Sequence, residues 1–171
     1  MFCVGPFTKN PDKEVVHTIV DLSAVYYAWR DVRACNAEMA NVRLNYDGLV
    51  RAAQDKVLGP NYPKNIWGVT TKMRPGIQEG FLSRLAARDW DLCVRADQVS
   101  LHPAPVAAQI AMAAIRHPDK KVLCISPGKQ LDEVLSWFPP DQVCLAFFAG
   151  RFATEHANTL VLDELIADCL I

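Results

Sequence analysis

Runs of apolar, β-branched and aromatic residues alternate along this chain with segments whose apolar residues recur at helical spacing. Five strand-like runs cover residues 15–20, 66–70, 90–94, 122–125 and 142–148. Helical segments lie between or after them, at residues 24–35, 47–57, 77–87, 106–115 and 131–137. Several of the strands are apolar at nearly every position, which is typical of a parallel sheet with helices on both faces. The sequence therefore predicts a doubly wound, Rossmann-like α/β fold with five parallel strands.

The predicted fold forms one domain over residues 15–171, preceded by an N-terminal arm of residues 1–14. A length of 171 residues suits a single domain with a sizeable core. We expect the region after Gly150 to form a final helix around residues 160–166 that packs on the sheet. The net charge of -1 excludes a strongly basic nucleic-acid coat but permits a local basic surface.

Cysteine usage and the N-terminal sequence bear on the cellular compartment. The six cysteines are scattered, without a CxxC pair or the spacing of a zinc site, so we expect reduced thiols. The first residues lack a basic start followed by an apolar core, which is the pattern of a secretory signal. The longest apolar stretch, Val106 to Ile115, is too short to span a bilayer. We therefore expect a cytoplasmic protein.

Functional residues are expected where the predicted strands end, because open parallel sheets bind ligands outside the carboxyl ends of their strands. These positions hold more cations than carboxylates. They are Asp21 and Ser23 after the first strand, Thr71, Lys72 and Arg74 after the second, Arg95 and Asp97 after the third, Ser126, Pro127, Gly128 and Lys129 after the fourth, and Arg151 after the fifth.

One part of the chain suggests a family. The first strand reads His17-Thr18-Ile19-Val20-Asp21-Leu22-Ser23, and an aromatic-rich helix follows it. This opening resembles that of NYN domains, the PIN-like nucleases, in which a strand ends in Asp, a small residue and Asn. The segments Leu44–Leu49 and Gly80–Leu85 resemble the start of the family's second helix and the helix before its third strand. The resemblance implies a PIN-like fold and a nuclease that holds Mg²⁺ or Mn²⁺ with several carboxylates, of which Asp21 would be one.

The chain departs from the family where metal-binding acids are expected. After the fourth strand the family typically has Ser-Gly-Asp-Ser-Asp-Phe, whereas this chain has Ser126-Pro127-Gly128-Lys129-Gln130-Leu131. The fourth helix begins without the family's Asp, at Pro105, and Ser23 replaces the Asn. Asp21 alone would supply too little charge to compete with water for Mg²⁺. The resemblance therefore implies a degenerate site, a pseudonuclease, in which no cofactor is needed.

Three functions remain open. We expect a domain that binds RNA or another phosphate-bearing ligand with little or no nuclease activity, using cations and Tyr26 as a stacking platform. The binding residues would be Lys72, Arg74, Arg95, Lys129, Arg151, Ser23, Ser126 and Tyr26. Alternatively, Asp97 or Asp132 joins Asp21 as a catalytic acid in a ribonuclease that depends on Mg²⁺ or Mn²⁺. The third alternative is a protein-interaction module, in which the apolar helix Val106–Ile115 forms a homodimer or binds another protein.

Overall fold

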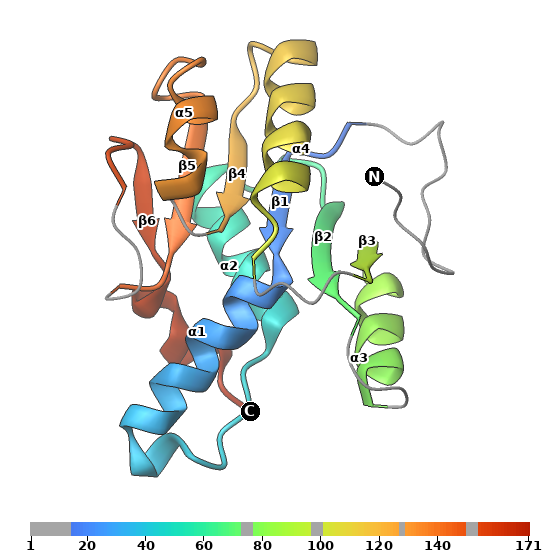
Figure 1. Cartoon of the computed structure of the whole chain (residues 1–171), viewed down its shortest axis with the longest axis vertical. Helices are drawn as coiled ribbons and strands as arrows, with labels where there is room; N and C mark the ends of the chain where they lie inside the picture. Colours follow the sequence, from blue (N-terminus) through green and yellow to red (C-terminus); the bar gives the residue numbers. More distant parts are fainter. Residues whose placement is uncertain (1–14, 73–76, 97–100, 127–128, 150–153) are drawn as a thin grey trace.

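The centre of the fold is a parallel sheet of six strands in the order β3-β2-β1-β4-β5-β6, shown by a computed structural model in Figure 1. The structure describes residues 15–72, 77–96, 101–126, 129–149 and 154–171. The strands are β1 (Thr18–Asp21), β2 (Ile66–Thr71), β3 (Trp90–Arg95), β4 (Val122–Ile125), β5 (Val143–Phe147) and β6 (Thr159–Val161). Every neighbouring pair is parallel. This confirms the doubly wound α/β prediction.

Helices cover both faces of the sheet. The α-helices are α1 (Leu22–Cys35), α2 (Tyr46–Val57), α3 (Ile77–Ala86), α4 (Pro103–Arg116) and α5 (Asp132–Leu135). The described residues also form the 3-10 helices η1 (Ala37–Met39), η2 (Lys129–Leu131) and η3 (Leu162–Cys169). Residues of α1, α2, α3 and η3 share one hydrophobic core, and residues of α4, η2 and α5 share the other.

Strand β1 separates the two cores because successive side chains of a strand point to opposite faces. Val20 belongs to the core under α1 and α2, whereas Ile19 belongs to the core under α4. Both side chains are 0% exposed. A strand buried on both faces favours apolar residues at consecutive positions, which explains why both Ile19 and Val20 are apolar.

Local signals in the sequence set the helix boundaries. Asp21 caps the N-terminus of α1, and Asn45 caps that of α2, where its side-chain oxygen accepts the N–H of Gly48 at 2.9 Å. Pro103 stands at the first position of α4, where no N–H is needed. Gly59, at φ 85°, follows α2 in the left-handed conformation that ends many helices.

The C-terminal region differs from the prediction. The sheet has a sixth strand, β6, so the predicted count of five is wrong. Leu160 lies in this strand, and the expected final helix is the 3-10 helix η3, whose Leu162 and Ile166 are buried against the sheet. The sequence misled here because a strand of three residues is too short to show alternation, and it runs directly into the helical pattern. The N-terminal arm lies outside the described residues.

Helix α4 is buried on one side only. Val106, Ile110 and Ala113 are 0% exposed, whereas Met112 is 37% and Ile115 is 69% exposed. The apolar character of this helix therefore reflects one core-facing side and a few exposed apolar side chains. No helix among the described residues is long and apolar enough to cross a membrane.

The described cysteines are mostly free thiols. Cys35, Cys124, Cys144 and Cys169 are free, and burial raises the pKa of the Cys144 thiol to about 11. Cys93 instead forms a disulfide bond. The expectation of reduced thiols is therefore wrong at Cys93, because disulfide pairing cannot be read from the spacing of cysteines.

Candidate functional site

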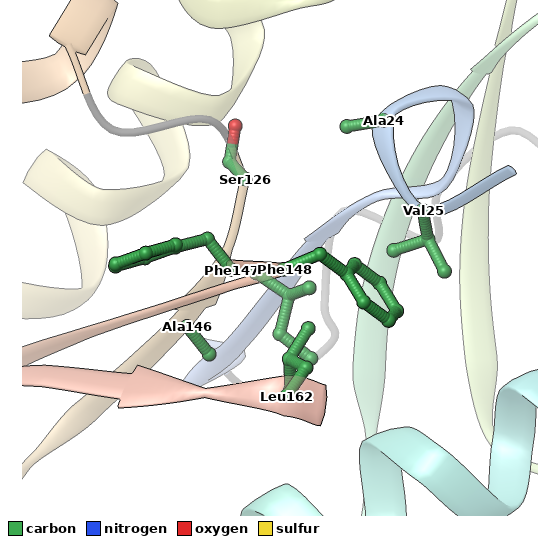
Figure 2. A pocket seen from close by; sticks show the side chains of 8 residues that line it. Ala24, Val25, Ser126, Ala146, Phe147, Phe148 and Leu162 are labelled. Carbon is green, nitrogen blue, oxygen red and sulfur yellow. The ribbon is translucent and has the colours of Figure 1, made fainter. Parts of the chain in front are cut away.

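The strand order reverses between β1 and β4, which is where an open parallel sheet most often binds its ligand. Here the described residues form a crevice of about 10 Å³, roughly the space of one water molecule. Figure 2 shows it lined by apolar side chains, with the Phe148 ring directed toward Val25. Ser126 contributes a single hydroxyl and is itself 4% exposed. The described residues around this crevice are therefore mainly apolar.

Asp21 ends β1 beside this crevice and is 0% exposed. One carboxylate oxygen, Oδ1, accepts the N–H of Ala24 at 3.1 Å, and the other, Oδ2, accepts the N–H of His102 at 2.7 Å. Burial raises the pKa of the carboxyl from 3.8 to about 6, and the N–H donors of His102, Ala24 and Ser23 offset part of that rise. Asp21 thus caps α1 and also binds the backbone of His102, the residue that precedes α4.

A cluster of buried hydroxyl and imidazole groups surrounds the start of α1. The Ser23 hydroxyl accepts the N–H of Thr71 at 3.2 Å and lies 3.3 Å from both the Thr70 hydroxyl and Nε2 of His102. The same Nε2 is 3.0 Å from the Thr71 hydroxyl. Ser23 and His102 are each 1% exposed. We call Asp21, Ser23, Thr70, Thr71 and His102 the polar brace.

The polar brace joins three elements that the sequence keeps far apart: the start of α1, the end of β2 and the start of α4. Its Ser and His do not form a nucleophile and base held by Asp21, because Asp21 binds the backbone of His102 and not its ring. Both side chains are also sealed from solvent. Within the described ranges no three His, Cys, Asp or Glu side chains gather in a way that would hold a metal ion. The geometry of the brace is that of a structural network.

A large groove opens beside the polar brace, and residues of both α1 and α3 line it. Figure 1 shows where these two helices lie in the fold. It encloses about 1670 Å³ and is lined by side chains from α1, the start of α2, the end of β2 and α3. Thr70 and Thr71 of the brace reach it. We call it the α1–α3 groove. Its polar and aromatic lining comprises Tyr26, Tyr27, Trp29, Arg33, Arg43, Asn45, Tyr46, Asp47, Lys72, Gln78, Phe81, Arg84 and Arg88.

Positive charge dominates this groove. Five cationic side chains line it, against one acid, Asp47. Asp47 is already neutralised, since its carboxylate lies 3.2 Å from Arg88 Nη1 and 3.4 Å from Arg51 Nε and accepts the Trp90 indole N–H at 2.8 Å. The groove therefore presents a surface suited to an anionic ligand.

Aromatic rings interleave with these cations. Tyr26 is 42% exposed and meets Tyr27 edge to face, with ring centroids 5.4 Å apart. The guanidinium of Arg30, a residue outside the groove lining, lies over the Tyr27 ring at 4.8 Å. Tyr46 of α2 and Phe81 of α3 meet edge to face at 5.2 Å. Because Tyr27, Tyr46 and Phe81 are only partly exposed, Tyr26 is the ring best placed to accept a flat ligand.

The structure divides the residues predicted from the sequence among several places. Lys72 and Tyr26 line the α1–α3 groove, and Arg95 ends β3 next to Lys72, whose N–H binds the Arg95 carbonyl at 2.6 Å. Asp21 and Ser23 lie in the polar brace, and Ser126 lines the crevice. Lys129 is exposed in η2, after β4, and does not line the groove. Asp97, Arg74 and Arg151 lie outside the described residues.

Several groove residues were missed because they do not follow strands. Trp29 and Arg33 lie within α1, Arg43 precedes α2, and Arg84 and Arg88 lie in and after α3. One signal was available, since Tyr26, Trp29 and Arg33 share a helical face by their spacing. His102 was also missed, because a lone histidine without ligand spacing gives no signal.

Comparison of the chain with family models, with curated proteins and with solved structures gave no match.

Proposed function

We propose that this chain is a degenerate NYN/PIN-like domain that binds single-stranded RNA in the α1–α3 groove and has little or no nuclease activity. The observation that carries the proposal is the groove lining, in which cations and aromatic rings alternate while the single acid is neutralised. Proteins that bind single strands combine a positive groove for the phosphates with rings on which bases stack. The groove offers both features on one surface.

The size of the groove favours a polymer over a small metabolite. Its volume of about 1670 Å³ exceeds the range of about 300–1,000 Å³ that is typical of small-molecule sites. The cations that line it also come from different elements, with Arg33 on α1 and Arg84 on α3. A strand with several phosphates can contact such a set of cations.

The surroundings of Asp21 support binding without cleavage. Both carboxylate oxygens accept backbone N–H groups, and the side chain is sealed from solvent. To act as a metal ligand the carboxylate would have to become exposed, because a hard cation such as Mg²⁺ keeps several water ligands. The first alternative, a ribonuclease dependent on Mg²⁺ or Mn²⁺, requires this rearrangement.

The test is binding of a fluorescent single-stranded RNA, followed by anisotropy at about 50 mM and about 200 mM salt. We expect binding that weakens with salt and is reduced by Lys72→Ala or Arg84→Ala. Lys129→Ala is the matched control, because Lys129 is an exposed cation outside the groove lining. Absence of binding at low salt would remove the proposal. RNA cleavage that requires Mn²⁺ and is abolished by Asp21→Asn would establish the ribonuclease instead.

The exposed side of α4 favours a second candidate, a protein-interaction module in which two copies of the chain pair. Met112 and Ile115 expose apolar side chains there. Light scattering on the purified chain tests this candidate. A dimer that Ile115→Asp converts to monomer would support it, and a monomer at high concentration would dismiss it.

A further inference from the structure

Helix α1 presents one stripe of side chains to the α1–α3 groove. Leu22, Tyr26, Trp29 and Arg33 all line it, at intervals of four, three and four residues. Such intervals place side chains on one face of a helix, one above another. Trp29 and Arg33 are therefore neighbours, one turn apart.

Both of these side chains carry a buried N–H group for which the described residues supply no acceptor. Trp29 is 4% exposed, and its indole Nε1 has no hydrogen-bond partner in the described part of the chain. The same holds for Nε of Arg33. Buried donors in folded proteins are nearly always paired, because an unpaired one has lost its water without gaining a partner. Two such donors on adjacent turns of one groove wall indicate a place prepared for an acceptor from outside the chain.

The neighbourhood determines which acceptor fits. Arg43 lines the same groove, and Arg33 is close enough to Tyr46 to act on the pKa of its hydroxyl, which burial raises to about 12. Tyr46 is consequently protonated at neutral pH and can also donate. The one acid of the lining, Asp47, is held by Arg51 and Arg88. Donors and positive charge, with the one acidic side chain of the lining already paired, favour an oxyanion.

We propose that Trp29 and Arg33 form an anchoring subsite in which the indole N–H and the guanidinium donate hydrogen bonds to a phosphate oxygen of the ligand. This inference rests on the proposed function and adds a specific contact to it. The planar guanidinium suits such a contact, since it presents several donors in a fixed arrangement. The phosphate is either internal to the strand or at its end, and the two sources share the same chemistry.

The NMR signal of the Trp29 indole N–H should respond directly to the proposed phosphate contact. A proton–nitrogen correlation spectrum of the full chain contains one indole signal from each of the four tryptophans, and Trp29 is assigned by through-bond experiments on the unmodified protein. Inorganic phosphate, RNA with a terminal phosphate and RNA of the same sequence without it are titrated separately. We expect the Trp29 proton to move downfield, as a new acceptor requires. The Trp90 indole, already bound to Asp47, and the exposed Trp137 should stay in place.

A pair of matched variants measures the contribution of Arg33. Arg33→Lys keeps the positive charge but removes the Nε donor, and we expect a loss of RNA affinity of roughly tenfold, the size typical of a hydrogen bond to a charged group. Arg30→Lys is the control, because Arg30 lies on the same helix and does not line the groove. It should bind RNA as the unmodified chain does.

The outcomes separate the subsite from the proposed function. RNA that binds without moving the Trp29 signal, with Arg33→Lys equal to Arg30→Lys, would overturn the subsite and leave the function standing. Phosphate that moves the signal while RNA fails to bind would support the subsite and overturn the function. A larger shift with the terminal phosphate identifies the end of the strand as the source, and equal shifts identify the internal phosphates. No shift with any probe and no RNA binding would overturn both.

Discussion

The Asp21 carboxylate accepts the backbone N–H of His102 at 2.7 Å and thereby joins the end of β1 to the residue that caps α4. The same carboxylate caps α1 through Ala24. Two helices on opposite faces of the sheet therefore begin at one buried acid. This relationship gives Asp21 a structural role that its position at the end of a strand did not reveal.

Burial of Asp21 makes stability depend on pH. Its pKa is about 6 in the folded protein, against 3.8 for an ordinary Asp, so the folded state holds its proton more tightly. The contribution of Asp21 is fully present below about pH 4 and is lost as the pH rises through about 6. The free energy of unfolding should fall by up to about 3 kcal/mol over this interval. Urea denaturation across the interval measures it.

Asp21→Asn should remove this pH dependence, because an amide does not titrate. The variant should also be less stable than the unmodified chain at low pH, by about 1–3 kcal/mol, since one of the two backbone N–H groups loses its acceptor. Asp55→Asn is the control, because Asp55 is exposed and its ion pair among the described residues is with the exposed Lys64. A pH profile that is unchanged in Asp21→Asn would contradict the assignment.

The hydroxyl of Ser23 should matter for stability and not for ligand binding. In Ser23→Ala the N–H of Thr71 loses the acceptor that now lies at 3.2 Å, which should lower the free energy of unfolding by about 1–3 kcal/mol. Affinity for RNA should change little, because the side chain is sealed from the groove. Ser83→Ala, at an exposed position of α3, should leave stability nearly unchanged. A stable Ser23→Ala that no longer binds RNA would show that the brace contacts the ligand.

The sequence was informative about the sheet because a strand that is buried on both faces is apolar at consecutive positions. The continuous apolar run at Ile19 and Val20 predicted β1, and five of the six strands fall where such runs lie. Strand β6 could not be recognised in the sequence because it has three residues, one of them exposed. Alternation cannot be recognised over so short a length.

The groove was harder to predict than the sheet because it is a property of surfaces that meet only in the folded chain. The rule that ligands bind beyond strand ends predicted Lys72 as a binding residue, but it predicted Lys129 as well. Lys72 follows β2 and Lys129 follows β4, so they lie on opposite sides of the point where the strand order reverses. Arg33 and Arg84 lie in helices, where a charged residue is ordinarily solvated. Only the packing of α1 and α3 around one hollow identifies them as neighbours of the same site.

Salt dependence should identify the cations that contact phosphates. Each contact that is lost reduces the slope of log affinity against log salt by about 0.7 for a single strand. We expect this reduction for Lys72→Ala and for Arg84→Ala, and a further reduction in the double variant. Lys129→Ala should keep the original slope. Equal effects of Lys72→Ala and Lys129→Ala would place the ligand along the strand ends and not in the groove.

Stacking on Tyr26 should be separable from charge. Tyr26→Ala removes an exposed ring from the wall of the groove, and the loss of one stacked base corresponds to about 1–3 kcal/mol of binding free energy. Tyr26→Phe should retain most of the affinity, because the ring remains. The salt slope should be the same in both variants, since no phosphate contact is lost. Trp137→Ala, which removes another exposed ring away from the groove, should leave binding unchanged. Anisotropy titrations with one RNA at two salt concentrations give all four comparisons, and a Tyr26→Ala variant with full affinity would show that bases do not stack there.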